Sequence, residues 1–267
     1  MNHVKRYPTA LTIAGSDSGG CAGIQADLKT FSSIGVFGAS VITSITAQNT
    51  QEVRAVEILP TGIIKQQTEA VLDDMMVDVV KTGMLPSAEI IELVASAIDA
   101  YRLNTVIIDP VMVATSGARL ASASTASAFC ELLYSRLTLI TPNVPEAEAL
   151  SGVNIQSDKD MQKAAEILLK QGCQAVLIKG GHLPAIQSVD MLFQQDKEPV
   201  SFSSVHIESR NLHGTGCTFS SAIAAYMALG NELETAVSLA KTYITSAIDA
   251  GKDIVTGNGF GPVNHFF

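Results

Sequence analysis

The stretch ALTIAGSDSGGCAGIQADLKTFSSIG, residues 10–35, decides the fold of this chain. It opens with a short apolar run, which predicts a buried strand, and a glycine-rich turn follows. After the turn, apolar residues recur at a spacing of three and four, at Ile24, Leu28, Phe31 and Ile34. This spacing places them on one face of a helix, and the glycine that follows is a common helix end. Strand, turn and helix in this order predict the beginning of a βαβ unit.

The same alternation continues along the chain. Further strands are predicted at 39–46, 78–84, 104–110, 137–143, 174–181, 189–195 and 200–207. Helices are predicted at 24–34, 61–74, 87–101, 158–171, after Gly214, and near 232–250. Strands that alternate with helices indicate an α/β fold, with a mostly parallel sheet and helices on both faces. We find no internal repeat or long linker, so we expect one domain that spans residues 1–267.

Two local features refine this prediction. The last two strands are expected to be antiparallel and joined near Asp196 and Lys197. For the helix at 158–171, Ser157 and Asp160 have the spacing of a capping box, and Gly172 is the expected stop.

Composition and charge exclude several classes of protein. The chain has 267 residues, 47% hydrophobic and 16% charged, with a formal net charge of -9. This acidic balance argues against a nucleic-acid-binding surface or a basic membrane face. No apolar stretch is long enough to span a bilayer, and we expect no signal peptide. The four cysteines form no CxxC pair, which is typical of reduced thiols in a cytoplasmic protein.

Polar residues gather where the predicted strands end. The ends carry the loop GSDSGGCAGIQAD, then Gln48-Asn49, Gly83-Met84, Asp109-Pro110-Val111, Asn143 with Glu146, and Lys179-Gly180-Gly181-His182. Any one of these segments has an alternative explanation as turn chemistry. Because the carboxyl ends of parallel strands meet at one edge, the segments together favour an active site there.

The individual residues leave alternatives open. The first loop is neither a Walker loop nor a good dinucleotide fingerprint, because Ser18 stands where the first glycine is required. Asp27 is either a carboxylate that favours a helix N-terminus or a substrate contact. Asp109 and Glu146 either hold Mg²⁺ or cap a turn and a helix. Lys179 either faces a phosphate or snorkels to solvent.

The turn Gly214-Thr215-Gly216-Cys217 is the sharpest signal. Successive backbone N–H groups at a helix N-terminus bind anions, and the helix dipole strengthens the binding. Such donors stabilise the charge that develops in phosphoryl transfer. A plain glycine-rich helix start is the less favoured alternative.

Eight segments together resemble one known family. They are LTIAGSDSGGCAGIQADLKTF, TAQNTQEV, KTGML, IDPVM, LITPNVPEAEAL, VLIKGGH, NLHGTGCTFSSAIAA and GFGPVNHF. From about residue 9 onward the chain resembles the hydroxymethylpyrimidine and phosphomethylpyrimidine kinases of thiamine biosynthesis, members of the ribokinase-like superfamily. The turn HGTGC and the loop GSDSGGCAGIQAD are the segments most specific to this branch.

This resemblance implies a ribokinase-like three-layer αβα fold and, commonly, a homodimer. It implies that ATP phosphorylates 4-amino-5-hydroxymethyl-2-methylpyrimidine and then converts the monophosphate to the pyrophosphate. By position, Gln48 would hydrogen-bond the aminopyrimidine. The other implied roles are pocket lining by Gly15, Asp27, Met84 and Val111, Mg²⁺ binding by Asp109 and Glu146, ATP binding by Asn143 and Lys179, and an anion hole formed by Gly214, Thr215, Gly216 and Cys217.

Cys217 stands where related kinases place a catalytic base, usually Asp. A helix N-terminus can lower a thiol pKa toward neutrality, which would allow Cys217 to act as the base. A residue less anionic than Asp would also repel the phosphate of the second substrate less.

Three rival functions remain to be distinguished. The nearest rival is a pyridoxal kinase, because the resemblance implies that pyridoxal kinases share this fold. A catalytically silent pyrimidine- or nucleotide-binding protein is disfavoured by the intact set of Asp109, Glu146, Lys179 and GTGC. A dehydrogenase is disfavoured by the incomplete dinucleotide fingerprint.

Overall fold

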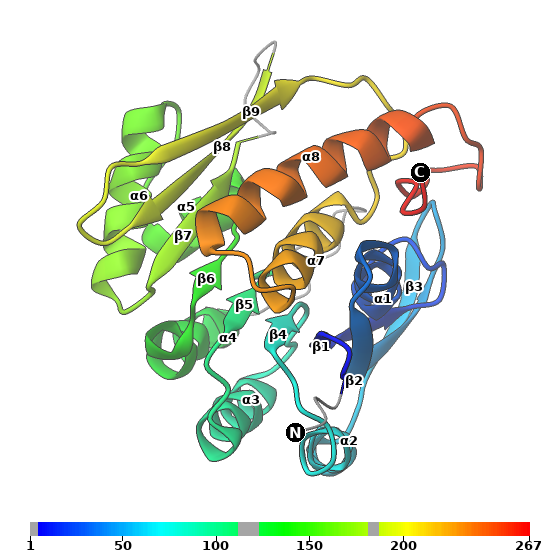
Figure 1. Cartoon of the computed structure of the whole chain (residues 1–267), viewed down its shortest axis with the longest axis vertical. Helices are drawn as coiled ribbons and strands as arrows, with labels where there is room; N and C mark the ends of the chain where they lie inside the picture. Colours follow the sequence, from blue (N-terminus) through cyan, green and yellow to red (C-terminus); the bar gives the residue numbers. More distant parts are fainter. Residues whose placement is uncertain (1–4, 112–122, 181–186) are drawn as a thin grey trace.

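The computed structural model describes residues 5–111, 123–180 and 187–267 (Figure 1). Within these residues one nine-stranded sheet runs through the molecule in the order β3-β2-β1-β4-β5-β6-β7-β8-β9. The strands are β1 Thr9–Asp17, β2 Phe37–Gln48, β3 Val53–Ile58, β4 Val79–Thr82, β5 Val106–Ile108, β6 Leu139–Ile140, β7 Ala175–Lys179, β8 Gln187–Gln194 and β9 Val200–Val205. The six strands from β2 to β7 in this order pair in parallel, while β3, β8 and β9 are antiparallel. The predicted mostly parallel sheet is confirmed.

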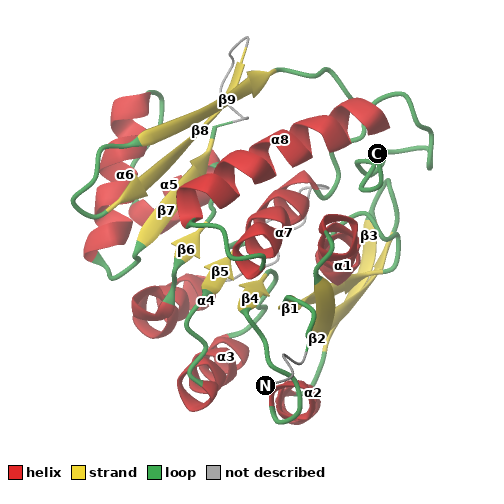
Figure 2. Ribbon diagram, in the orientation of Figure 1, coloured by secondary structure: helices red, strands yellow, loops and turns green. Residues whose placement is uncertain are grey.

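Helices cover both faces of this sheet (Figure 2). The helices are α1 Gly23–Ile34, α2 Thr61–Leu72, α3 Ala88–Tyr101, α4 Ala123–Ala128, α5 Val144–Ser151, α6 Asp158–Lys170, α7 Thr215–Ala228 and α8 Leu233–Gly251, with a π-helical turn Phe129–Leu133 and a 3₁₀ turn Tyr134–Arg136. Phe31 of α1, Ile223 of α7 and Val237 of α8 pack in one buried cluster. Ile64 of α2 and Leu168 of α6 pack in a second one. These two cores, one on each face, make the three αβα layers.

The first strand and helix form as their sequence predicts, with one extension. β1 continues through Gly15 to Asp17, and its register against β2 shifts between Ala14 and Ser16. A side chain at Gly15 would come within 2.7 Å of Ser44 Oγ, so a larger residue here would require the Ser44 side chain to move. α1 ends at Gly35, whose φ of 89° is left-handed, as expected for a helix end.

The predicted start of the helix at residue 158 is confirmed, but the capping box predicted there is wrong. Ser157 precedes α6, but its side chain caps no backbone N–H and instead donates to the Asp160 carboxylate at 2.7 Å. The reciprocal capping box forms at Asn143 and Glu146, at the start of α5.

Edge strand β3 has no counterpart in the predicted elements, because its side chains are mostly exposed and it lacks a buried apolar run. Among the described residues, no helix combines the length and apolar character that crossing a membrane requires.

Candidate active site

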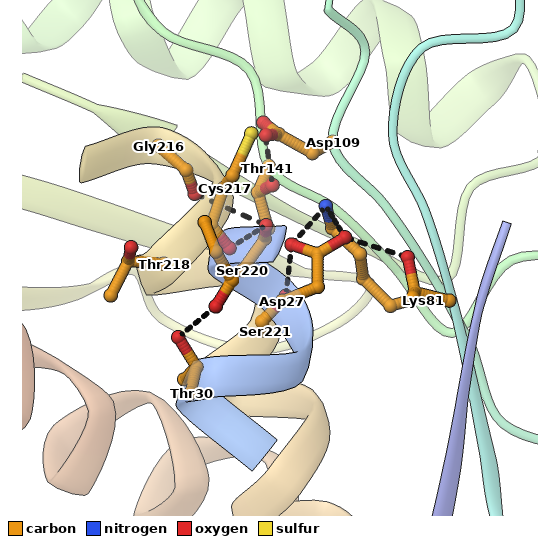
Figure 3. Close-up of polar contacts among 12 residues, drawn as sticks. Asp27, Thr30, Lys81, Asp109, Thr141, Gly216, Cys217, Thr218, Ser220 and Ser221 are labelled. Carbon is orange, nitrogen blue, oxygen red and sulfur yellow. Dashed lines mark hydrogen bonds and ion pairs between the residues drawn. The ribbon is translucent and has the colours of Figure 1, made fainter. Parts of the chain in front are cut away.

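The N-terminus of α7 meets residues at the carboxyl ends of β5 and β7. Figure 3 shows Asp109, after β5, beside Gly216 and Cys217 of α7. A side chain at Gly216, in the first turn of α7, would lie 3.3 Å from Lys179 Nζ and 3.8 Å from Asp109 Oδ2. Lys179 is the last residue of β7, and Asp109 follows β5 directly. The structure thus brings three of the predicted site residues, which are far apart in sequence, into one place.

The turn before α7 requires glycine. Gly214 is the N-cap residue, with a left-handed φ of 82°, and a side chain there would overlap the carbonyl oxygen of Cys21. The turn therefore rests directly on the glycine-rich loop that follows β1. The N–H of Thr215 donates to the Leu212 carbonyl at 3.2 Å. The first N–H groups of a helix have no partner inside the helix, so those of Gly216 and Cys217 are suited to an anion.

The loop after β1, unlike the turn before α7, uses its backbone N–H groups for hydrogen bonds of its own. The carboxylate of Asp17 accepts hydrogen bonds from the backbone N–H groups of Gly19, Cys21 and Ala22, at 2.8, 3.0 and 2.8 Å. The hydroxyl of Ser18 accepts from the N–H of Gln48 and donates to its carbonyl. The N–H groups of the loop are therefore used internally, and the loop acts as a support on which the α7 turn rests.

Asp109 and Lys179 form an ion pair of 2.8 Å at this edge. Burial alone would raise the pKa of Asp109, but the ammonium groups of Lys179 and Lys81 hold this pKa below its usual value. Burial alone would lower the pKa of Lys179, but Asp109 and Glu146 raise it. Both groups are therefore charged at neutral pH, and Lys179 is held by its partner rather than extended into solvent.

Asn143 and Glu146 begin α5 beside this pair. The Asn143 side chain accepts from the N–H of Glu146, and Glu146 accepts from the N–H of Asn143, both at 2.9 Å. Glu146 is 7% exposed and close enough to raise the pKa of Lys179. The described ranges contain no cluster of three His, Cys, Asp or Glu suited to a metal. Two carboxylates nevertheless fit Mg²⁺, which binds through one or two carboxylates plus water and phosphate oxygens.

Asp27 lies in the interior, away from the edge where a substrate would bind. Its carboxylate accepts hydrogen bonds from Thr12 Oγ1 and Ser221 Oγ, each at 2.6 Å, and from Lys81 Nζ. The side chains of Asp27 and Lys81 are fully buried. The sequence offered a substrate contact or a helix-start carboxylate for Asp27, and the structure instead places it in a buried ion pair that connects α1, β4 and α7 (Figure 3).

Sequence reasoning missed Lys81, Thr12 and Ser221. The buried position of Lys81 could have been predicted from the sequence, since this lysine interrupts the apolar strand segment DVVKTGM. A lysine in a strand buried on both faces needs an acidic partner, and Asp27 was available.

Cys217, in the first turn of α7, lies close enough to Lys81, Asp109 and Asp27 for their charges to act on its thiol. Burial raises the pKa of the Cys217 thiol to about 12, a rise that Lys81 opposes and that Asp109 and Asp27 reinforce. The expectation that the helix N-terminus lowers this pKa toward neutrality is therefore wrong, because desolvation and two carboxylates outweigh the helix dipole.

The other predicted pocket residues, Gly15, Met84, Gln48 and Val111, lie in three places. A side chain at Gly15 would lie 3.5 Å from Met84 Sδ, so these two residues are neighbours. Gln48 contacts His213, with 2.9 Å between Gln48 Nε2 and His213 Nε2. Val111 lies next to the ion pair, and its N–H donates to the Asp109 carbonyl at 2.8 Å. Gly181 and His182, at the end of the motif KGGH, lie outside the described residues.

Comparison with known proteins places this site in a family. The family model for phosphomethylpyrimidine kinase matches residues 17–264. The chain is 50% identical over 257 residues to the thiamine biosynthesis bifunctional protein ThiED of Geobacter sulfurreducens, covering 96% of this chain and 52% of that protein. The chain thus spans about half the length of this bifunctional relative.

Two further proteins match over nearly their whole length. The hydroxymethylpyrimidine/phosphomethylpyrimidine kinase of Bacillus subtilis is 48% identical, covering 96% of this chain and 94% of that protein. The crystal structure of an ADP complex of Bacillus subtilis pyridoxal kinase superposes with a TM-score of 0.90 at 39% identity, covering 97% of this chain and 98% of that one. The predicted ribokinase-like fold and the predicted family are both confirmed. The chain belongs to the phosphomethylpyrimidine kinase family.

Proposed function

We propose that this protein transfers the γ-phosphoryl group of ATP to 4-amino-5-hydroxymethyl-2-methylpyrimidine, and then to the resulting monophosphate, in thiamine diphosphate biosynthesis. The observation that carries the proposal is the first turn of α7, where Gly216 lies against the Asp109–Lys179 ion pair. The Bacillus subtilis relative is named for both kinase activities, and the pyridoxal kinase neighbour binds ADP.

The residues of this edge have complementary roles in such a transfer. The N–H groups of the Gly214–Cys217 turn and the dipole of α7 stabilise negative charge on the transferred phosphoryl group. Lys179 adds a positive charge on the ATP side, with Asn143 beside it. Asp109 and Glu146 would hold Mg²⁺, which neutralises phosphate charge when bound. Because the transition state of phosphoryl transfer is loose, positioning and charge stabilisation carry most of the catalysis.

Cys217 would face the acceptor oxygen as a neutral thiol. The second acceptor is a phosphate monoester, which is already ionised and attacks without a strong base. A neutral thiol at this position repels that phosphate less than a carboxylate would. Gly15, Met84 and Val111 would line the pyrimidine pocket and Gln48 would bind its polar edge. Asp27 would not contact the substrate. Its carboxylate would instead position α7, through its bonds to Lys81 and Ser221.

We also propose that the chain works as a single domain, in the cytoplasm, as a homodimer. All four cysteines are free thiols, as is usual in a reducing compartment. Val56 and Ile58 are exposed on the edge strand β3, where a second copy could cover them. Light scattering after gel filtration tests this point, and a monomeric mass at micromolar concentration would contradict it.

The test of the main proposal is ATP-dependent product formation with Mg²⁺, followed by mass spectrometry, on the hydroxymethylpyrimidine and on pyridoxal. Sequential appearance of the pyrimidine mono- and diphosphate is expected. Pyridoxal kinase is the second candidate, because the pyridoxal kinase neighbour shares this fold at a TM-score of 0.90. Phosphorylation of pyridoxal alone would favour that candidate and refute the pyrimidine assignment.

A further inference from the structure

A segment near the C-terminus, residues 257–261, joins two parts of the candidate site. The N–H of Phe260 donates to the Thr50 carbonyl at 2.8 Å, and the Gly261 carbonyl accepts from the N–H of His213 at 3.1 Å. Thr50 lies in the turn after β2, and His213 lies in the turn before α7. Two consecutive residues of this segment therefore connect the end of β2 to the start of α7.

Gly259 packs backbone to backbone against the turn after β2. A side chain at Gly259 would lie 2.1 Å from the Thr50 carbonyl oxygen and 2.9 Å from Gln51 Cα. The N–H of Gly259 also donates to the Thr50 hydroxyl at 3.2 Å. Gly259 does not have a positive φ, so close packing, and not an unusual backbone conformation, requires glycine here.

The turn after β2 is held together by its own first residue. The side-chain oxygen of Asn49 accepts from the N–H of Gln51 at 2.8 Å and from that of Glu52 at 3.0 Å. The N–H of Asn49 donates to the Glu52 carbonyl at 3.1 Å. Because the turn moves as a unit, a displacement of Thr50 is transmitted to Gln48, which directly precedes it.

The other side of the segment is fixed to the residues before α7. The buried side chain of Asn211 donates to the carbonyls of Gly251 and Ile254, at 2.7 and 2.6 Å. Beyond the segment, Pro262 forms an isolated parallel bridge with His213. The segment is thus attached to the start of α7 on both sides, so its contact with Thr50 sets where the end of β2 lies relative to α7.

We propose that residues 257–261 are a positioning element that holds Gln48 at a set distance from the turn before α7, with Thr50 as the residue through which they act. The inference rests on the proposed function, in which Gln48 binds the aminopyrimidine and the α7 turn binds the transferred phosphoryl group. A pyrimidine held at Gln48 reacts only if its acceptor oxygen reaches that turn, so this distance determines alignment. The proposed ATP residues Lys179 and Asn143 belong to β7 and the start of α5, so the element acts on the acceptor and not on ATP.

Gly259→Ala tests the positioning, because the added methyl group forces the segment and the turn apart. The KM for the hydroxymethylpyrimidine should rise about tenfold or more, while the KM for ATP should change by less than about twofold. Gly62→Ala is the matched control, since a methyl group there meets nothing within 4 Å, and both KM values should be retained. No rise in the KM for the pyrimidine, or an equal rise in the KM for ATP, overturns the inference.

Two milder variants decide the question if Gly259→Ala does not fold. Thr50→Val preserves the side-chain shape but leaves the Gly259 N–H without its acceptor, and should raise the KM for the pyrimidine about threefold or more. Thr50→Ser keeps a hydroxyl and should retain the wild-type value. A Thr50→Val protein with the wild-type KM contradicts the role of Thr50.

A double variant shows whether the segment acts through Gln48. Adding Gly259→Ala to Gln48→Ala should change the KM for the pyrimidine by less than about twofold, because the displaced side chain is already absent. Phe267→Ala is the control for a loosened C-terminus, since the Phe267 ring packs against Tyr243 at 5.3 Å between centroids, and it should leave this KM unchanged. Effects of Gly259→Ala and Gln48→Ala that multiply, or an equal rise in Phe267→Ala, overturn the inference.

NMR of the protein without substrate separates this inference from the proposed function. The side-chain amide resonances of Gln48 should shift in Gly259→Ala and stay in place in Phe267→Ala. Unchanged Gln48 resonances in Gly259→Ala overturn the inference, whichever substrate the protein phosphorylates. If the wild-type protein phosphorylates no pyrimidine, the proposed function fails, while the resonances still decide whether residues 257–261 position Gln48.

Discussion

The ammonium group of Lys81 lies 2.9 Å from Asp27 Oδ1 and 3.0 Å from Oδ2, in a pair with no exposed surface. Ser221 of α7 and Thr12 of β1 donate to the same carboxylate. Burial alone would lower the pKa of Lys81, but Asp27 and the other acidic groups nearby raise it, so the lysine is charged. Helix α7 is therefore anchored at Ser221, four residues beyond Cys217, by a buried charge.

Lys81→Met should destabilise the fold by about 3–5 kcal/mol, because it leaves the Asp27 carboxylate buried and unpaired. The free energy of unfolding from urea denaturation measures the effect. Lys65→Met is the control, since its ion pair with Glu69 is exposed and should matter by about 0.5 kcal/mol or less. The double variant Lys81→Met with Asp27→Leu should recover part of the loss. Equal stability of Lys81→Met and the control would mean that the buried pair is not essential.

Lys179→Met should lower kcat for pyrimidine phosphorylation by about 10²–10³-fold, the usual effect of removing one preorganised charge stabiliser. The residue contacts Asp109 and lies against Gly216, where the phosphoryl group is expected to bind. Steady-state kinetics with saturating pyrimidine measures the change, with Lys252→Met as the control on an exposed pair. A change of less than threefold would remove Lys179 from the proposed ATP site.

Gly214→Ala should be more harmful than Gly230→Ala, although both glycines have a left-handed φ, 82° and 89°. A methyl group at Gly230 meets nothing within 4 Å, so the cost is backbone strain of about 1–2 kcal/mol. A methyl group at Gly214 also overlaps the Cys21 carbonyl oxygen, which adds about 1–3 kcal/mol and shifts the anion-binding turn. Thermal unfolding and activity are the measurements. Similar values for the two variants would show that the contact with Cys21 relaxes freely.

The neutral thiol of Cys217 gives a pH prediction with a definite sign. Its pKa in the folded protein is raised to about 12, above the value of about 8.5 for a free thiol. The folded state thus holds the proton more tightly, so the stabilisation is complete below about pH 8.5 and is lost as the pH rises toward 12. Cys217→Ser should make the decline in stability over this range shallower.

Alkylation checks the same property independently. At pH 7.5, Cys217 should react with iodoacetamide at least about tenfold more slowly than free cysteine, because the thiolate is the reactive form. Peptide mass spectrometry identifies the modified residue. Rapid labelling of Cys217 would show that it is ionised and would restore its role as a general base.

The sequence predicted the elements of the site better than their contacts. Asp109 and Lys179 were placed at strand ends, and the parallel sheet brings such ends to one edge. Their pairing, and that of Asp27 with Lys81, depends on which strands are neighbours. The order β1-β4-β5-β6-β7 is a property of the whole sheet and could not be obtained from local periodicity.

The two candidate capping boxes also show that residue spacing alone does not predict which contacts form. Asn143 with Glu146 and Ser157 with Asp160 have equal spacing, and the sequence favoured the second pair. Glu146 reaches back to the N–H of its N-cap residue, whereas the Asp160 side chain, one methylene shorter, bonds to the Ser157 hydroxyl. Side-chain length therefore decided which of the two motifs forms, and spacing alone did not contain that information.

The anchoring of α1, β4 and α7 at the Asp27 carboxylate also has a consequence for motion. Because α1, β4 and α7 share one buried charge, we expect them to move together, so that the turn before α7 does not tilt by itself. The microsecond-to-millisecond rearrangements that often limit turnover in kinases then occur in other segments of the chain. In hydrogen–deuterium exchange, the amides of α7 around Ser221 should be among the last to exchange, opening only with global unfolding.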